Sequence, residues 1–217
     1  DLTLETSYNL ELSFKTDFDW VNTELNVFHN WSHNYILQEN TGDWFDLNDE
    51  VFVSDCATEA DCLPVYQAMQ RDARFYGFEA QVAFPVWIGE DNQFDMTLFS
   101  DYVRGELVSE GNVPRMPPLR YGLQFDYTGY DVFAAGLRLT RAQAQTHTGD
   151  NETDTPGYLL LDINFNYTLQ FEDKAEALFF VKANNLLNET IRNSTSILRD
   201  VAPEPGRGVE LGIRLRF

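Results

Sequence analysis

Hydrophobic and polar residues alternate along most of this chain. The stretch 208–217 shows the pattern clearly, because charged or small residues separate the apolar side chains Val209, Leu211, Ile213, Leu215 and Phe217. A period of two places alternate side chains on opposite faces of a β-strand. The pattern therefore predicts a strand that is apolar on one face and polar on the other. Such strands occur at the edge of a β-sandwich and in the wall of a transmembrane β-barrel.

The same alternation recurs and predicts an all-β fold of about nine strands. Each predicted strand is close to the length that a tilted strand needs to cross a membrane. The alternating stretches are residues 4–14, 21–37, 75–84, 94–102, 119–127, 133–140, 159–169, 179–184 and 209–217.

The connections between these strands alternate in length. Short turns are predicted near residues 17, 88, 129 and 173, and longer polar connections near residues 50, 113, 150 and 198, of which the first is a loop from Gln38 to about Pro64. Outer-membrane barrels show this alternation, with short periplasmic turns and long external loops. Aromatic residues beside the short turns fit a girdle at the membrane interface. These are Trp20, Phe84, Trp87, Phe94, Tyr127, Tyr130, Phe171 and Phe217. Together the two signals favour an antiparallel transmembrane β-barrel over a sandwich.

Composition narrows the class of protein. Aromatic residues make up 14% of the 217 residues, yet the mean hydropathy is −0.35 and no uninterrupted apolar run is long enough for a membrane-spanning helix. The net charge is −20, so no basic face is available to neutralise a phosphate backbone, and nucleic acid is excluded as a partner.

Two cysteines, Cys56 and Cys62, stand six positions apart in an acidic stretch. Without histidines at ligand spacing they make a poor zinc site, so a disulfide that closes a short loop is the simpler prediction. A disulfide implies an oxidising compartment. No signal peptide precedes the first strand, so we expect the natural N-terminus to lie upstream of Asp1.

An odd number of strands has a consequence for closure. The first and last of nine antiparallel strands run in the same direction, whereas bacterial single-chain barrels use an even number. Either an eight-stranded barrel spans about Trp20 to Phe217, or the chain is the C-terminal part of a larger barrel. The first stretch is as clearly amphipathic as the others, which favours the larger barrel.

Several motifs resemble those of TonB-dependent outer-membrane receptors. The stretch 184–189, Asn-Asn-Leu-Leu-Asn-Glu, is similar to a signature late in these receptors, and 203–207, Pro-Glu-Pro-Gly-Arg, is similar to the segment that introduces their final strand. The motif residues are Asn185, Leu186, Asn188, Pro205, Gly206 and Arg207. The resemblance implies a barrel of twenty-two strands, of which residues 1–217 are the last nine or so. The N-terminal plug, the first strands and the segment that engages TonB are then absent from this chain.

The resemblance also implies a function. It is the uptake of a scarce metal or metal chelate across the outer membrane of a Gram-negative bacterium, with energy supplied through TonB and the long loops outside. Membrane lipid surrounds the wall, and the outer-membrane assembly machinery reads the final strand, with Phe217 at its tip. The stretch 192–203 is similar to a segment of zinc-type receptors, in which a histidine commonly stands where this chain has Ser194. The serine at this position puts the assignment of zinc as the transported metal in doubt.

His147, Asp150, Glu152 and Asp154 form a candidate metal-capturing loop, although a solvated run of charges is the favoured explanation of these residues. His29 and His33 have the spacing of a helical chelate, but on a strand this spacing separates the side chains by about 13 Å. No resident cofactor is predicted beyond a transported metal ion or chelate.

Enzyme chemistry finds no support, because the chain lacks a Gly-x-Ser-x-Gly, a phosphate-binding loop and a His-Glu-x-x-His. Two alternatives stay open. A passive porin or small eight-stranded barrel needs neither a plug nor an energised partner. A secreted β-sandwich binding module is soluble without detergent and buries its apolar face.

Overall fold

The structure is a computed structural model that describes residues 2–56, 58, 61–150, 152–171 and 175–217. In these residues, ten β-strands form one sheet. Within the described ranges, no helix is long and apolar enough to cross a membrane. The strands are β1 (Thr6–Phe18), β2 (Val21–Asp46), β3 (Val51–Val53), β4 (Cys62–Ile88), β5 (Asn92–Leu107), β6 (Arg120–Gly129), β7 (Phe133–Ala142), β8 (Tyr158–Gln170), β9 (Glu176–Asn184) and β10 (Gly208–Arg216).

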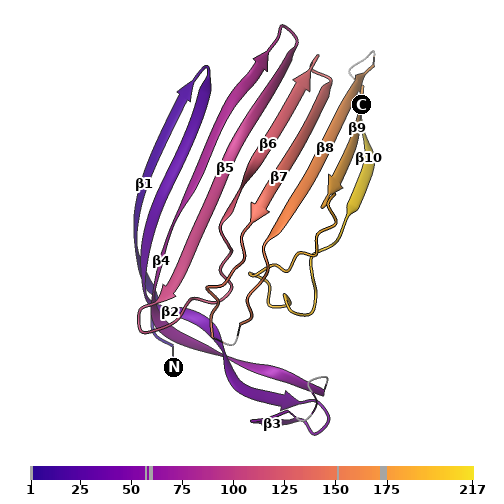
Figure 1. The fold of residues 1–217 in the computed structure, drawn as a ribbon. Helices are drawn as coiled ribbons and strands as arrows, with labels where there is room; N and C mark the ends of the chain where they lie inside the picture. Colours follow the sequence, from indigo (N-terminus) through magenta and orange to yellow (C-terminus); the bar gives the residue numbers. More distant parts are fainter. Residues whose placement is uncertain (1, 57, 59–60, 151, 172–174) are drawn as a thin grey trace.

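Nine of these strands form a continuous antiparallel wall. Their order is β1-β2-β4-β5-β6-β7-β8-β9-β10, so every wall strand lies beside its neighbour in the chain, and the short β3 pairs only with β2. In the described part of the chain, β1 and β10 each pair on one side only, and the sheet is open. The predicted nine wall strands are confirmed, and β1 and β10 run in the same direction (Figure 1).

Short and long connections lie at opposite ends of the wall (Figure 1). The short connections follow β1, β4, β6 and β8, while the connections that follow β5, β7 and β9 are long and gather at the other end. We call these the turn end and the loop end. The predicted alternation is confirmed for the described residues, although the turn predicted at residues 172–174 lies outside them.

The prediction of a loop from Gln38 to Pro64 is wrong in part. β2 and β4 both continue past the wall and, with β3, form an arm of residues 34–72 that projects from the loop end (Figure 1). The arm begins at a register shift between Ser32 and Tyr35, where Asn34 has a positive φ of 54°. Such bulges bend a strand away from its sheet. Beyond Leu37 most of the described arm residues are exposed or half-buried on both faces. Such strands need no apolar alternation, which explains why the sequence pattern does not reveal this part of the arm.

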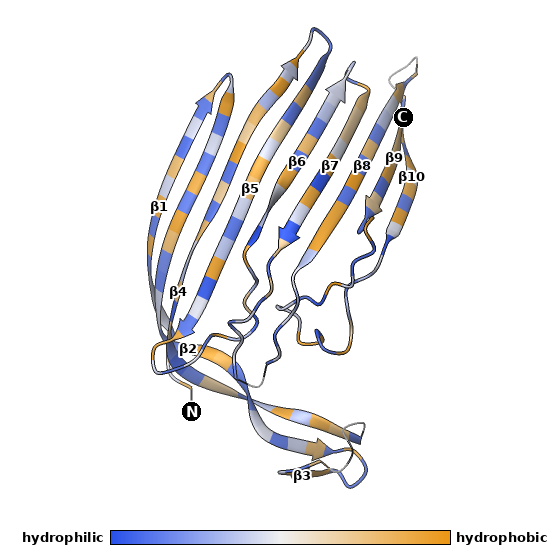
Figure 2. Cartoon of the chain, viewed as in Figure 1, coloured by the Kyte–Doolittle hydropathy of each residue, from blue (hydrophilic) through white to orange (hydrophobic). Residues whose placement is uncertain are grey.

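Hydrophobic and hydrophilic residues alternate along the wall strands (Figure 2), so the wall has one largely apolar face, the outer face, and one largely polar face, the inner face. Residues in register across neighbouring strands share a face. One outer row consists of Leu12, Val27, Phe78 and Tyr102. One inner row consists of Ser13, Asn26, Glu79, Asp101 and Arg120. The outer row is apolar without interruption, which agrees with the predicted barrel wall.

Aromatic side chains on the inner face lie over glycines of the adjacent strand. Each pair is directly in register, so the ring covers a site where a larger residue would meet it. This arrangement covers the backbone of glycine in a sheet and pins the register. The pairs are Phe28–Gly77, Phe75–Gly105, Phe99–Gly122 and Phe180–Gly212.

A small hydrophobic core anchors the first long connection to the inner face. Leu37, Ala73, Leu107 and Val113 are all buried and form one cluster, against which Met116 packs. Val113 belongs to the connection after β5, so this connection folds inward over the wall instead of extending outward.

We expect Gly77→Ala to destabilise the wall. A Cβ atom at Gly77 would lie 2.0 Å from the carbonyl oxygen of Tyr102, which is backbone and cannot move aside alone. Overpacking of this kind costs about 2–3 kcal/mol, so the full-length protein should unfold at lower urea concentration. Gly208→Ala is the control, because no atom lies within 4 Å of the added methyl. Equal unfolding midpoints for the two variants would contradict this account of the close packing at Gly77.

Candidate functional site

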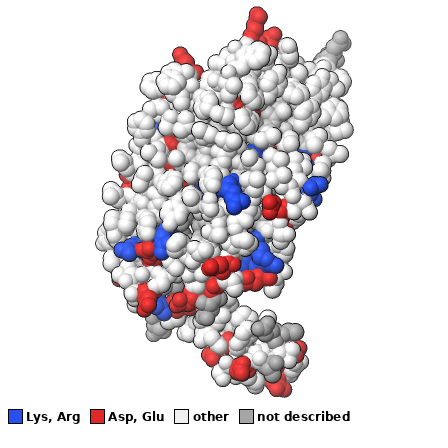
Figure 3. Space-filling view, in the orientation of Figure 1, with Lys and Arg blue, Asp and Glu red and all other residues white. Residues whose placement is uncertain are grey.

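Three inward-folded connections form a layer at the loop end of the wall (Figure 1). They comprise residues 108–119, 143–157 and 185–207, which we call the loop layer. In the view of Figure 3, charged groups gather toward this end, whereas most of the wall is uncharged. The loop layer is where the described chain brings distant charged residues together.

An ion pair between Glu152 and Arg199 holds two of these connections together. The two groups lie 2.6 Å apart, and their side chains are only 11% and 7% exposed. The other oxygen of Glu152 accepts hydrogen bonds from the backbone N–H groups of Arg115 and Gly149, at 3.1 and 3.0 Å. Arg199 also donates to the carbonyl of Ser194 at 2.8 Å. One carboxylate therefore joins all three connections.

The carbonyl of Met116 is a second junction in the loop layer. The buried hydroxyl of Ser194 donates to it at 2.9 Å, and the side-chain amide of the buried Gln145 donates to it at 3.0 Å. Asn112 adds a hydrogen bond to the carbonyl of Thr148 at 3.0 Å. A serine hydroxyl with this partner is engaged in packing the layer, which agrees with the departure from the zinc-type pattern at this position.

A small cavity of about 50 Å³ lies between the base of the arm and the loop layer. Its volume is enough for a water molecule or a bare ion, and much too small for a chelate within this chain alone. Its lining includes four carboxylates and two guanidinium groups, so it is acidic. The charged lining residues are Glu39, Asp150, Glu152, Asp200, Arg115 and Arg199.

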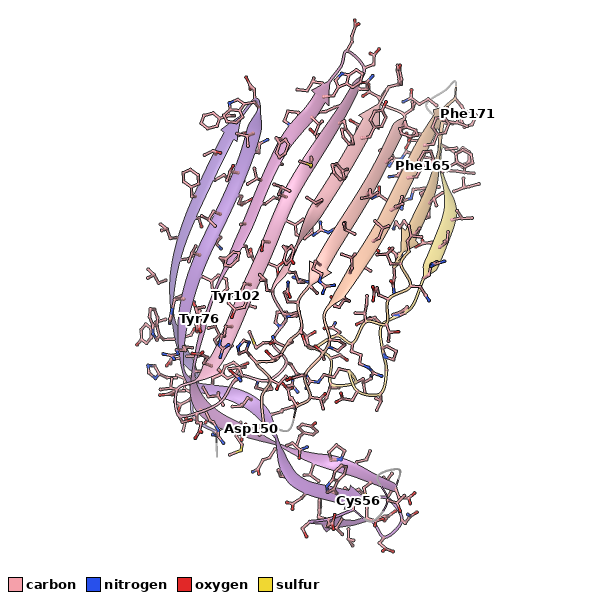
Figure 4. The ribbon with its side chains drawn as sticks, in the orientation of Figure 1. Cys56, Tyr76, Tyr102, Asp150, Phe165 and Phe171 are labelled. Atoms are coloured by element: carbon pink, nitrogen blue, oxygen red, sulfur yellow. A yellow bond between two sulfur atoms is a disulfide. The ribbon has the colours of Figure 1, made fainter. Side chains whose placement is uncertain are left out.

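The four residues predicted to capture a metal lie close in sequence but take different surroundings. Asp150 lines the acidic cavity and is labelled in Figure 4, whereas Glu152 is engaged by Arg199. His147 lines a separate pocket beside Met116, and Asp154 accepts a hydrogen bond from Thr148 at 3.4 Å. Among the residues that the structure describes, no group of three or more His, Cys, Asp or Glu side chains could hold a metal ion. A metal site in this loop therefore stays a prediction.

The two histidines of β2 do not act together. The ring of His29 stacks on Trp31 with centroids 4.0 Å apart, while Nδ1 of His33 lies 3.3 Å from the carboxylate of Asp72. Each histidine has its own surroundings, as expected for this spacing on a strand.

The two family-like motifs meet in space. Asn185 is buried with a positive φ of 50°, and its side-chain amide donates to the carbonyls of Glu189 and Pro205 at 2.9 and 3.3 Å. The side chain of Asn188 accepts a hydrogen bond from the backbone N–H of Arg207 at 3.1 Å. The motifs therefore join the end of β9 to the start of β10. Leu186 completes the corner, because its N–H donates to the carbonyl of Leu161 at 2.9 Å, and Gly206 lies beside Asn188.

The disulfide between Cys56 and Cys62 is present, at the far end of the arm (Figure 4). The terminal strand is also as predicted, since β10 presents Val209, Leu211, Ile213 and Leu215 to the exterior and leaves Phe217 at the turn end. Recognition of this strand by the outer-membrane assembly machinery remains a prediction.

The residues that organise the loop layer have no sequence signal. Arg199, Gln145 and Asn112 stand in stretches without periodicity, and their partners lie 47, 29 and 36 positions away. Only the three-dimensional path of the loops brings these groups together.

We expect Arg199→Met to loosen the loop layer. The variant leaves the carboxylate of Glu152 buried without its ion-pair partner, which costs about 3 kcal/mol or more. Backbone amides in residues 147–155 and 194–201 should then exchange with deuterium about 100-fold faster in the full-length protein. The double variant Glu152→Gln with Arg199→Met should recover much of the protection. Unchanged exchange in the single variant would show that the ion pair does not hold the layer.

We expect the double variant Cys56→Ser with Cys62→Ser to affect the arm alone. A disulfide that closes so short a loop contributes about 2 kcal/mol by restricting the unfolded chain. The arm projects from the wall, so limited proteolysis should cut it at least tenfold faster, while the urea midpoint of the wall stays unchanged. A lower midpoint for the wall would indicate that the arm supports the sheet.

Comparisons with known proteins agree with this architecture. A family model for a TonB dependent receptor-like β-barrel matches residues 1–186. The chain is similar to the structure of the copper transporter OprC, with 16% identity and a TM-score of 0.72 over 99% of this chain and 31% of that one. It is also similar to the siderophore receptor PirA from Acinetobacter baumannii, with 21% identity and a TM-score of 0.59 over 98% of this chain and 32% of that one. At these identities the likeness concerns the fold alone, and this chain spans about a third of each structure's length.

Proposed function

Because this chain belongs to the TonB-dependent receptor β-barrel family, we propose that it forms part of the wall and loops of an outer-membrane receptor. The complete receptor takes up a scarce metal ion or metal chelate with energy supplied through TonB. The outer face contacts membrane lipid, the loop layer faces the cell exterior, and the assembly machinery recognises the final strand with Phe217. The proposal extends the family assignment to a cargo, an energy source and an orientation.

The observation that carries the proposal is the loop layer itself. Its three connections fold over the inner face and are tied together by Glu152 and Arg199. An ordered, acidic layer at the mouth of a barrel offers a binding surface that a passive channel does not require. Its carboxylates favour a metal ion or a cationic metal complex. The two similar structures are a copper transporter and a siderophore receptor, which supports a metal-related cargo.

The whole receptor, with all residues of its natural reading frame, provides the test. Gram-negative cells that produce it should accumulate copper(II) or a ferric siderophore when TonB is functional, and the accumulation should fall to background in cells without TonB. Metal content per cell, measured by mass spectrometry, is the readout. Equal metal accumulation with and without TonB would support the passive porin instead and would refute the proposal.

Two exposed carboxylates of the acidic cavity allow a more specific prediction. The double variant Asp150→Asn with Asp200→Asn removes two negative charges from the lining, so the receptor should bind copper(II) about tenfold more weakly, a change of about 1.4 kcal/mol. Asp154→Asn is a matched control from the same connection, because Asp154 is not part of the cavity lining. The binding constant comes from calorimetry on the full-length receptor. Equal losses in the control and the double variant would argue against the cavity.

A further inference from the structure

Four polar side chains form a cluster on the outer face, which is otherwise mostly apolar. Arg74 stands in register with Glu106, and Tyr76 with Arg104, on the adjacent strands β4 and β5. The same register row continues through His29 to Leu10, which places the cluster on the outer face. Charges on the membrane face of a barrel cost about 2–4 kcal/mol at mid-membrane and almost nothing at its edge. The cluster therefore marks the membrane boundary at the loop end.

Glu106 is the centre of the outer-face cluster. Its carboxylate accepts hydrogen bonds from Arg104 at 2.7 Å, from Arg74 at 2.9 Å and from the hydroxyl of Tyr76 at 3.1 Å. Arg104 is held further by Asn112, at 3.2 Å. Two guanidinium groups share one carboxylate, so the cluster carries an excess positive charge in a chain whose net charge is −20. The side chain of Arg74 remains 51% exposed and can take another anion.

An apolar groove leads along the outer face to this cluster. Its volume is about 890 Å³, and it spans β1, β2, β4 and β5. Tyr76 and Tyr102, labelled in Figure 4, lie close to each other toward the loop end. The outer-face lining consists of the apolar residues Leu10, Leu12, Leu25, Val27 and Phe78 and the polar residues His29, Arg74, Tyr76, Tyr102 and Glu106, and Phe28 and Gly77 complete the lining. Most of the groove is therefore lined by apolar side chains, and the end at the cluster is cationic.

We propose that this groove binds a phosphorylated lipid of the surrounding membrane. The acyl chain lies on the apolar side chains, and the phosphate accepts hydrogen bonds from Arg74. A guanidinium fork matches the geometry of a phosphate and is less strongly hydrated than an ammonium, which suits a site at the membrane boundary. Free phosphate would use only the cationic end and would leave the apolar length empty. The inference rests on the proposed function in one respect only, the placement of the outer face in a membrane.

The test measures lipid binding to the complete receptor in detergent by native mass spectrometry. The probes are diphosphorylated lipid A, phosphatidylcholine and inorganic phosphate. We expect lipid A to bind at least tenfold more tightly than the other two probes. Arg74→Gln should weaken lipid A binding about tenfold and Arg74→Lys by less, because Glu106 keeps its bonds to Arg104 and Tyr76 in both variants. Arg141→Gln is the matched control, since Arg141 is an exposed arginine in register with Tyr121 on the outer face, outside the groove.

Each contrary result overturns the inference. Unchanged lipid A binding in Arg74→Gln, or an equal loss in Arg141→Gln, would place the lipid elsewhere. Equal binding of phosphatidylcholine would exclude recognition of the anionic headgroup, and equal binding of inorganic phosphate would indicate a simple anion site. Metal uptake by the same variants keeps the two proposals apart. Loss of lipid binding with TonB-dependent uptake intact removes only the lipid site, whereas lipid binding without such uptake removes only the transport proposal.

Discussion

The antiparallel hydrogen-bond ladder from β1 to β10 is the constraint on which the rest of the structure depends. Inside a membrane no water is present to satisfy backbone N–H and C=O groups, so strands that cross it must satisfy one another. A ladder between consecutive strands also assigns every side chain to the outer or the inner face and every connection to one of two ends. The apolar wall, the turn end and the loop end all follow from this pairing.

The connections of the loop layer leave the ladder and must replace its hydrogen bonds. Side chains supply the replacements: Glu152 receives two backbone N–H groups, and Asn185 bonds both the carbonyl and the N–H of Glu189. Buried polar groups with complete partners give a defined shape, whereas unpaired ones are costly. The loop layer is therefore as specifically built as the wall, although it contains almost no regular structure.

Much of the wall could be predicted from the sequence, because a strand with one apolar and one polar face must alternate with a period of two. The nine wall strands and the closing strand with Leu211 and Ile213 follow from that rule. The arm beyond Leu37 could not be predicted, since most of its described residues are exposed or half-buried on both faces, and the Cys56–Cys62 disulfide is its main local signal. Resemblance singled out Asn185 and Pro205, but only the structure shows their contact. The Glu152–Arg199 ion pair could not be predicted from the sequence, because the two residues are 47 positions apart in stretches without periodicity.

The placement of cations follows from the acidity of the chain. With 15 Lys and Arg against 35 Asp and Glu, each arginine can be held by a carboxylate while many carboxylates remain without one. Arg199 forms an ion pair with Glu152 in the loop layer, and Arg120 forms one with Asp101 on the inner face. At Glu106 the ratio is reversed, because two arginines converge on one carboxylate. Such a local excess of positive charge is costly to place beside apolar surface unless an anion completes it. The outer face therefore carries an excess of positive charge at this cluster, directly beside the apolar groove.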